Sequence, residues 1–124
     1  MSRQLAAKYV LQTTVGVTYY IVVEALNNPF EGDFDLRVTP VTPPANDICS
    51  NAVIVQPNST VTGTITNSAG LDRTCTDFSS DPSVWYTLNG TGAVYEITTC
   101  SGRLNFQAAI SISSGECQNQ QCIV

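Results

Sequence analysis

Apolar and polar residues alternate with a period of two along most of this chain, and that alternation restricts the folds it can adopt. In the run DFDLRV, residues 33–38, the apolar residues share one face of an extended strand and the charged residues share the other. Similar strand-forming runs lie at residues 8–14, 18–26, 60–66, 83–88, 93–99 and 106–112. No segment has a helical period beyond one turn after Asp47. The pattern predicts an all-β protein.

Four short polar clusters separate these runs and predict tight turns: NNPFEG, NSAG, NGTG and SSGE, which begin at residues 27, 67, 89 and 113. Seven or eight short strands with such connections favour an antiparallel β-sandwich of the jelly-roll kind. In the NGTG cluster, Asn89 suits the positive φ of a tight hairpin turn. Tyr95 and Ile97 would then lie on the strand that pairs with residues 83–88.

Three prolines within residues 40–44 interrupt the strand pattern, because proline cannot donate to a sheet ladder. We interpret residues 40–45 as a linker. Residues 1–39 then form the terminal strands of one module, and residues 46–124 form most of the next.

The composition excludes several classes of partner. Charged residues make up only 12% of the 124 residues, the net charge is -5, and no basic patch is available to neutralise phosphates. Nucleic-acid binding is therefore not expected. The longest apolar run is far too short to insert into a membrane. The start of the sequence lacks the apolar core of a signal peptide.

Five cysteines and a single lysine in a threonine-rich sequence favour an oxidising, extracellular or cell-surface compartment. The cysteines lack the paired spacing of zinc sites, so disulfides are the favoured interpretation. Asn58 and Asn89 begin glycosylation sequons. An extracellular sequence without a signal peptide is expected to be an excerpt of a longer protein.

The sequence has no histidine, which excludes the serine and cysteine nucleophile systems that need an imidazole base. Its acidic residues fall mainly in turns and on outward strand positions, and none is marked out as a catalytic pair. We therefore predict that the protein is not an enzyme and assign no catalytic residue.

Residues 46–124 carry an ordered set of motifs, NDICSNA, TVTGT, VWY, TC and SSGEC. In this combination they resemble the cysteine-containing repeats similar to bacterial pre-peptidase C-terminal (PPC-type) domains of large secreted or surface proteins. Residues 18–23 and 32–38 resemble the end of such a repeat. By this resemblance the second repeat lacks its last strands. We therefore expect residues 8–38 to fold into the vacant place, which gives one sandwich in circularly permuted order.

The resemblance also implies specific sites. Cys49 would pair with Cys75, and Cys100 would pair with Cys117 or Cys122, which leaves one cysteine over. Acidic positions matching Asn46, Asp47 and Asp72 bind calcium in some PPC-type domains, so Ca²⁺ is the candidate cofactor. Ser83 replaces the aspartate that often precedes the VWY run, which weakens this transfer. The alternative is that Asn46 and Asp47 cap a short turn by accepting backbone N–H groups.

Aromatic residues are the remaining candidates for binding. Trp85 and Tyr86 lie on opposite faces of one strand, so they do not form one platform, and Trp85 is expected in the core. Tyr19 or Tyr20 offers an exposed ring for a ligand.

The expected function is a non-catalytic structural, adhesive or accessory binding module. The alternative is an accessory domain of a secreted hydrolase that binds polysaccharide or protein substrate. Its partners would be neighbouring repeats of the same protein and an extracellular polysaccharide or protein.

Overall fold

The computed structural model describes residues 7–26, 31–70, 75, 81–99 and 104–124. The protein divides into two units, residues 1–42 and 43–124. The division lies within the proline-rich segment.

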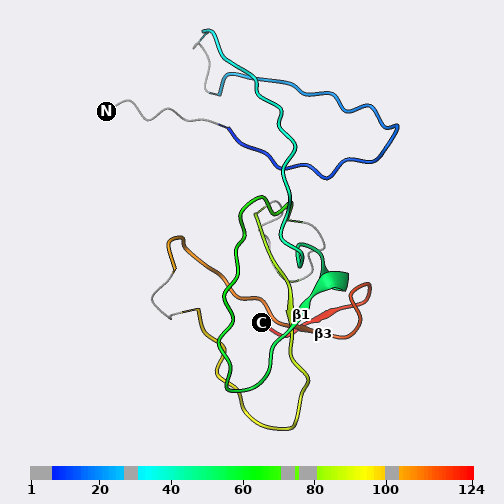
Figure 1. Ribbon diagram of the computed structural model, residues 1–124, viewed down its shortest axis with the longest axis vertical. Helices are drawn as coiled ribbons and strands as arrows, with labels where there is room; N and C mark the ends of the chain where they lie inside the picture. The colour runs from blue at the N-terminus through cyan, green and yellow to red at the C-terminus, as the bar shows by residue number, and fades with distance from the viewer. Residues whose placement is uncertain (1–6, 27–30, 71–74, 76–80, 100–103) are drawn as a thin grey trace. The chain divides into compact units, whose positions relative to one another are not determined.

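The second unit begins with a 3-10 helix and a small parallel ladder (Figure 1). The helix η1 spans Cys49–Asn51 and ends where the Ala52 N–H donates to the Cys49 carbonyl at 3.0 Å. Strand β1, Val53–Ile54, follows directly and pairs in parallel with β2, Tyr86–Thr87. The Val55 N–H extends the ladder by donating to the Thr87 carbonyl at 2.8 Å. Two segments more than 30 residues apart are therefore joined side by side.

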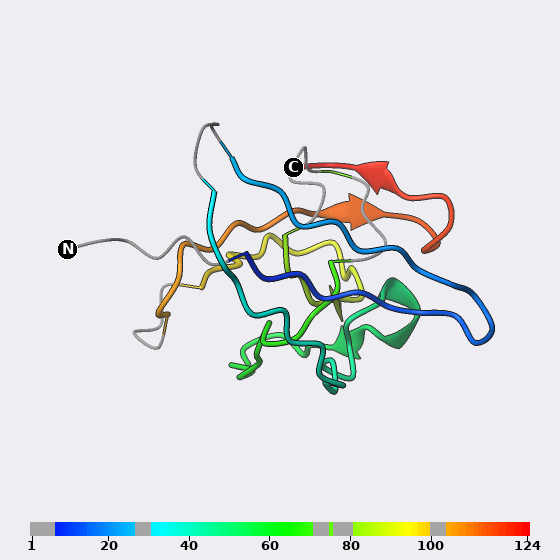
Figure 2. The ribbon, with the colours of Figure 1, turned by 90° about the horizontal axis from the view of Figure 1, so that it is seen from above.

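The last residues of the protein form an antiparallel hairpin, which Figure 2 shows in orange and red. Strand β3, Ser113–Ser114, pairs with β4, Gln121–Cys122. Gly115 at φ 99° opens the connection, where its positive φ suits glycine. The Ile112 N–H donates to the Val124 carbonyl at 2.8 Å and closes the pairing. The predicted antiparallel connection is confirmed, but Ser113 and Ser114 of the predicted SSGE turn lie in β3, and the turn follows at Glu116–Asn119, where the Asn119 N–H donates to the Glu116 carbonyl at 2.9 Å.

The predicted hairpin of residues 83–88 with residues 93–99 differs from the pairing observed. Tyr86–Thr87 pairs with Val53–Ile54 instead, and no ladder joins residues 83–88 to 93–99. The expected positive φ at Asn89 is also wrong, because among the described residues of that turn only Gly92 has one, at 85°. A two-residue Asn-Gly hairpin turn requires positive φ at both positions. The backbone bends at Gly92 instead, which removes the tight reversal.

Few described side chains are buried. Cys49 is the buried apolar residue among them, and Asp47 and Ser68 are the buried polar residues. The two short sheets neither confirm nor contradict a β-sandwich, which stays a prediction. Across the described ranges, no helix has the length and apolar character to cross a bilayer.

The first unit consists of extended segments. Residues 7–14 and 17–26 form two arms joined by a turn at Val15 and Gly16, visible in blue in both ribbon views. Gly16 has φ 80°, and the Val17 N–H donates to the Thr14 carbonyl at 3.2 Å. Among the described residues of this unit, that is the only backbone to backbone hydrogen bond. The arms follow the predicted strand positions without forming a ladder.

Candidate functional site

Asp47 is the centre of a buried polar cluster in the second unit. The Asp47 N–H donates to the Pro44 carbonyl at 3.1 Å, so the backbone turns just after the prolines. The side chain is only 5% exposed. Its carboxylate accepts a hydrogen bond from the Ser68 hydroxyl and is 3.1 and 3.3 Å from the Ala69 N–H donor. A residue at the start of the unit thereby holds a loop more than 20 positions away.

Ser68 connects this carboxylate to a third segment. A turn at Asn67, with φ 62°, and a 3.1 Å bond from the Ser68 N–H to the Ile65 carbonyl direct the residue inward. Its hydroxyl accepts from the Ser83 N–H at 3.0 Å and lies 2.5 Å from the Ser83 carbonyl. A hydroxyl has one proton, so it donates to Asp47 or to Ser83 at any one time. Segments around residues 47, 68 and 83 therefore meet at one oxygen.

Asn46 and Trp85 join the same region through two hydrogen bonds to each other, one between their backbones and one from the Asn46 side chain. The Trp85 N–H donates to the Asn46 carbonyl, and the Asn46 side-chain amide donates to the Trp85 carbonyl, both at 2.9 Å. The Val53 N–H donates to the same Trp85 carbonyl at 3.1 Å. Trp85 is half-buried. Its indole Nε1 and the Ser83 Oγ are buried atoms without a hydrogen-bond partner among the described residues.

Calcium requires free oxygen ligands, but two of the candidate residues, Asn46 and Asp47, already form hydrogen bonds within the protein. Asp47 accepts from protein donors, and Asn46 donates through its amide nitrogen. Asp72 lies outside the described residues. Within the described ranges, no group of three or more acidic, histidine or cysteine side chains could hold a metal ion. Asp47 accepts a backbone N–H, as the capping alternative expects, but that N–H belongs to Ala69 and not to its own turn, and among the described residues no side chain caps η1.

Two disulfides attach the C-terminal hairpin to the rest of the second unit. Cys49 bonds to Cys117, with Cα atoms 5.7 Å apart, and Cys75 bonds to Cys122, with Cα atoms 5.3 Å apart. The prediction of disulfide bonding is confirmed.

The predicted cysteine partners are wrong. Cys49 does not bond to Cys75, and both predicted partners of Cys100 are bonded elsewhere. Cys100 itself lies outside the described residues. Bridging requires Cα atoms within about 7 Å, and it is the path of the backbone that brings η1 next to the loop after β3. The order of the cysteines in the sequence does not show which of them the backbone brings together.

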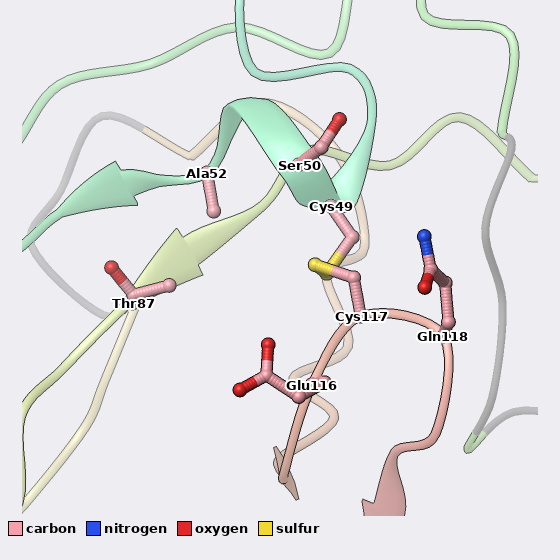
Figure 3. Close-up of a pocket in the computed structure, with 7 residues that line it drawn as sticks. All are labelled: Cys49, Ser50, Ala52, Thr87, Glu116, Cys117 and Gln118. Carbon is pink, nitrogen blue, oxygen red and sulfur yellow. A yellow bond between two sulfur atoms is a disulfide. The ribbon is translucent and has the colours of Figure 1, made fainter.

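A hollow of about 380 Å³ lies beside the first disulfide (Figure 3). The bridge forms one wall, and Ala52 and Thr87 form the side nearest the parallel ladder. Glu116 directs its carboxylate toward the hollow. The Gln120 amide, from the same hairpin, donates to Cys49 Sγ at 2.9 Å, and its oxygen accepts from the Ser113 hydroxyl at 3.1 Å. The hollow is lined by the Glu116 carboxylate, the Gln118 amide and small side chains, and it is open to solvent.

Two residues of these sites, Ser68 and Gln120, were not predicted from the sequence. Ser68 lies within the predicted NSAG turn, where a hydroxyl commonly bonds to nearby backbone. That signal does not identify Asp47, 21 positions away, as its partner. Nothing in the sequence distinguishes Gln120 from its neighbouring glutamines.

The two candidate tyrosines differ in their surroundings. Tyr20 is 94% exposed, whereas Tyr19 is 40% exposed and its hydroxyl accepts from the Thr14 N–H at 3.1 Å. Tyr20 is therefore the freer ring. The sequon asparagines Asn58 and Asn89 are both exposed.

No protein-family model, no curated protein and no solved structure matches this sequence. The PPC-type resemblance of residues 46–124 accordingly stays a prediction.

Proposed function

We propose that this protein is a non-catalytic, disulfide-bonded module of a secreted or cell-surface protein, with a structural, adhesive or accessory binding role. The pair of disulfides carries this proposal. They close loops with sequence separations of 68 and 47 residues and fasten one hairpin at two points. Such bonds persist in oxidising compartments and are rare in reducing ones.

The buried polar cluster supports a structural role for Asp47, the acidic residue proposed from the sequence as a calcium ligand. Asp47 is 5% exposed and satisfies the Ser68 hydroxyl and the Ala69 N–H. A carboxylate that a substrate can reach would need an accessible oxygen and a partner acid or base. The observed contacts use Asp47 to hold loops together.

The exposed aromatic ring of Tyr20 supports a binding role. Aromatic side chains offer a large, rigid and amphipathic contact surface at low entropic cost. We propose an extracellular polysaccharide or protein as the ligand. Cosedimentation with insoluble polysaccharides tests the first option. Tyr20→Ala should abolish binding, and Tyr86→Ala is the control because Tyr86 lies in the second unit. Equal binding by the Tyr20→Ala variant would reject this surface.

A peptide map of the oxidised protein tests the proposed module directly. The protein is oxidised in a glutathione buffer, free thiols are alkylated, and it is digested without reduction. We expect Cys49 linked to Cys117 and Cys75 linked to Cys122. Tandem fragmentation separates the two hairpin cysteines. Alkylation of all five thiols would contradict the proposal and reopen the choice of compartment.

Melting curves with and without calcium extend this experiment. Because Asp47 already binds protein donors, we expect no rise in melting temperature on adding Ca²⁺. A calcium-dependent rise would restore Asn46, Asp47 and Asp72 as candidate ligands.

A further inference from the structure

We infer that Asn89 is a site of spontaneous deamidation through a succinimide ring, a modification that is independent of the proposed function. In this reaction the Gly90 backbone nitrogen attacks the amide carbon, Cγ, of Asn89 and forms a new C–N bond. The bond between Cγ and the amide nitrogen Nδ2 breaks, and ammonia leaves with the proton that the Gly90 nitrogen loses. Water then opens the ring at either carbonyl and gives aspartate or isoaspartate. The net change is one water consumed and one ammonia released.

The surroundings of Asn89 leave this reaction unhindered. Asn89 and Gly90 are exposed and lie outside the helix and strands of the described residues. No atom lies within 4 Å of where a Cβ on Gly90 would be, so the approach to its nitrogen is open. Within the described residues the Gly90 N–H donates no hydrogen bond. Because glycine is conformationally permissive, the backbone can reach the geometry of attack at low cost.

Three other asparagines of the same unit, Asn46, Asn51 and Asn67, are followed by a backbone nitrogen that is already hydrogen-bonded. After Asn46, the Asp47 N–H donates to Pro44 at 3.1 Å, and after Asn51 the Ala52 N–H donates at 3.0 Å. After Asn67, the Ser68 N–H donates to Ile65 at 3.1 Å, and Ser68 is only 3% exposed. These nitrogens must break a hydrogen bond before they can attack. The fold therefore protects these three sites and leaves Asn89 unprotected.

The modification would change three properties of this turn. It adds one negative charge to a protein of net charge -5. It converts the acceptor asparagine of the sequon to an acid, so deamidation and N-glycosylation compete for the same nitrogen. Isoaspartate also inserts an extra backbone carbon between Leu88 and Gly90, which lengthens the connection from β2 to residues 93–99.

Tryptic mapping separates these asparagines cleanly. Cleavage after Arg73 and Arg103 gives a peptide in which Asn89 is the only asparagine, and cleavage after Arg37 and Arg73 gives one that contains Asn46, Asn51, Asn58 and Asn67. The folded, oxidised protein is incubated at mildly alkaline pH, then reduced, alkylated and digested. Mass spectrometry and enzymatic isoaspartate labelling measure the product in each peptide. Tandem fragmentation assigns the product to individual asparagines, and we expect product at Asn89 to accumulate several-fold faster than at Asn46, Asn51 and Asn67, whose following N–H groups are hydrogen-bonded.

Two comparisons decide the outcome. Gly90→Ala should slow the reaction at Asn89 several-fold, because a side chain restricts the backbone that must close the ring. Incubation in urea should leave the rate at Asn89 unchanged and raise it at Asn46, Asn51 and Asn67. Equal rates at Asn89 and at Asn46, Asn51 and Asn67 of the folded protein, or a rate at Asn89 that rises strongly in urea, would overturn the inference.

Discussion

Residues 31–38 and the two arms of the hairpin at residues 112–124 are both extended, but only the hairpin pairs its backbone groups. In the first, Phe34, Leu36 and Val38 alternate with charged residues and remain 58 to 75% exposed. In the second, the Ile123 N–H donates to the Ile112 carbonyl at 2.8 Å, and disulfides at Cys117 and Cys122 hold the hairpin. An alternating pattern makes a strand possible, and a long-range constraint makes it pair.

The same contrast extends to the two units. The described part of residues 7–42 has exposed side chains throughout, apart from the half-buried Val10. The described part of residues 43–124 has few buried side chains as well, but it adds two cross-links and the Asp47 cluster. In the second unit, disulfides and buried polar contacts therefore hold segments together, a role that a buried apolar core has in most domains of this length.

Removing a disulfide should lower the stability of the second unit more than removing the Asp47 carboxylate or changing the hairpin turn. In the loop-entropy model each bond contributes about 4 kcal/mol, because it closes a loop of 68 or 47 residues. The variants Cys49→Ala/Cys117→Ala and Cys75→Ala/Cys122→Ala should both lower the urea midpoint. Fluorescence of Trp85, the only tryptophan, reports on the second unit. As a control in the first unit, cleavage by trypsin after the exposed Arg37 should be unchanged. A urea midpoint of either variant equal to that of the parent protein would show that the disulfide does not stabilise the second unit.

Removing the buried carboxylate should have the next largest effect. Asp47→Ala removes the acceptor of the half-buried Ala69 N–H and leaves the buried Ser68 hydroxyl only the Ser83 carbonyl, which costs about 2 to 3 kcal/mol. Asp47→Asn keeps one acceptor oxygen, so it should cost about half as much. Chemical denaturation followed by Trp85 fluorescence measures both. If the two variants are as stable as the parent, the cluster does not hold the loops together.

These contacts show which features the sequence could predict. The presence of disulfides, the turn at Asn67 in the NSAG cluster and the antiparallel connection of the last hairpin depend on local patterns and composition, and all are observed. Of the predicted strand runs, which all lie within the described residues, only residues 83–88 contain a paired strand, Tyr86–Thr87. The parallel pairing of β1 with β2, the cysteine partners and the Asp47 to Ser68 bond depend on segments 21 to 68 residues apart. One sequence without an alignment records local preferences and does not record which distant segments meet.

A substitution in the turn of the C-terminal hairpin should reduce the free energy of unfolding by a smaller amount. Gly115 has φ 99°, and a methyl group there would lie 2.8 Å from the Asn119 carbonyl oxygen. Gly115→Ala should therefore cost about 1 to 3 kcal/mol. Gly90→Ala is the matched control, since Gly90 lies in open space without a positive φ, and it should change stability little. Equal midpoints for the two variants would show that the turn is not conformationally constrained.

The smallest effect is expected in the first unit. Val22 is 76% exposed and Leu36 is 58% exposed, so Val22→Thr and Leu36→Thr should change the free energy of unfolding by less than about 0.5 kcal/mol. Ile112→Thr, in the half-buried hairpin ladder, is the control and should cost more. The prediction that residues 8–38 complete a permuted sandwich requires the opposite, because Val22 and Leu36 would then contribute to its core. A loss of stability at Val22 or Leu36 as large as the loss at Ile112 would favour that arrangement. Each substitution by Thr replaces apolar carbon with a hydroxyl, and a buried site then loses transfer free energy.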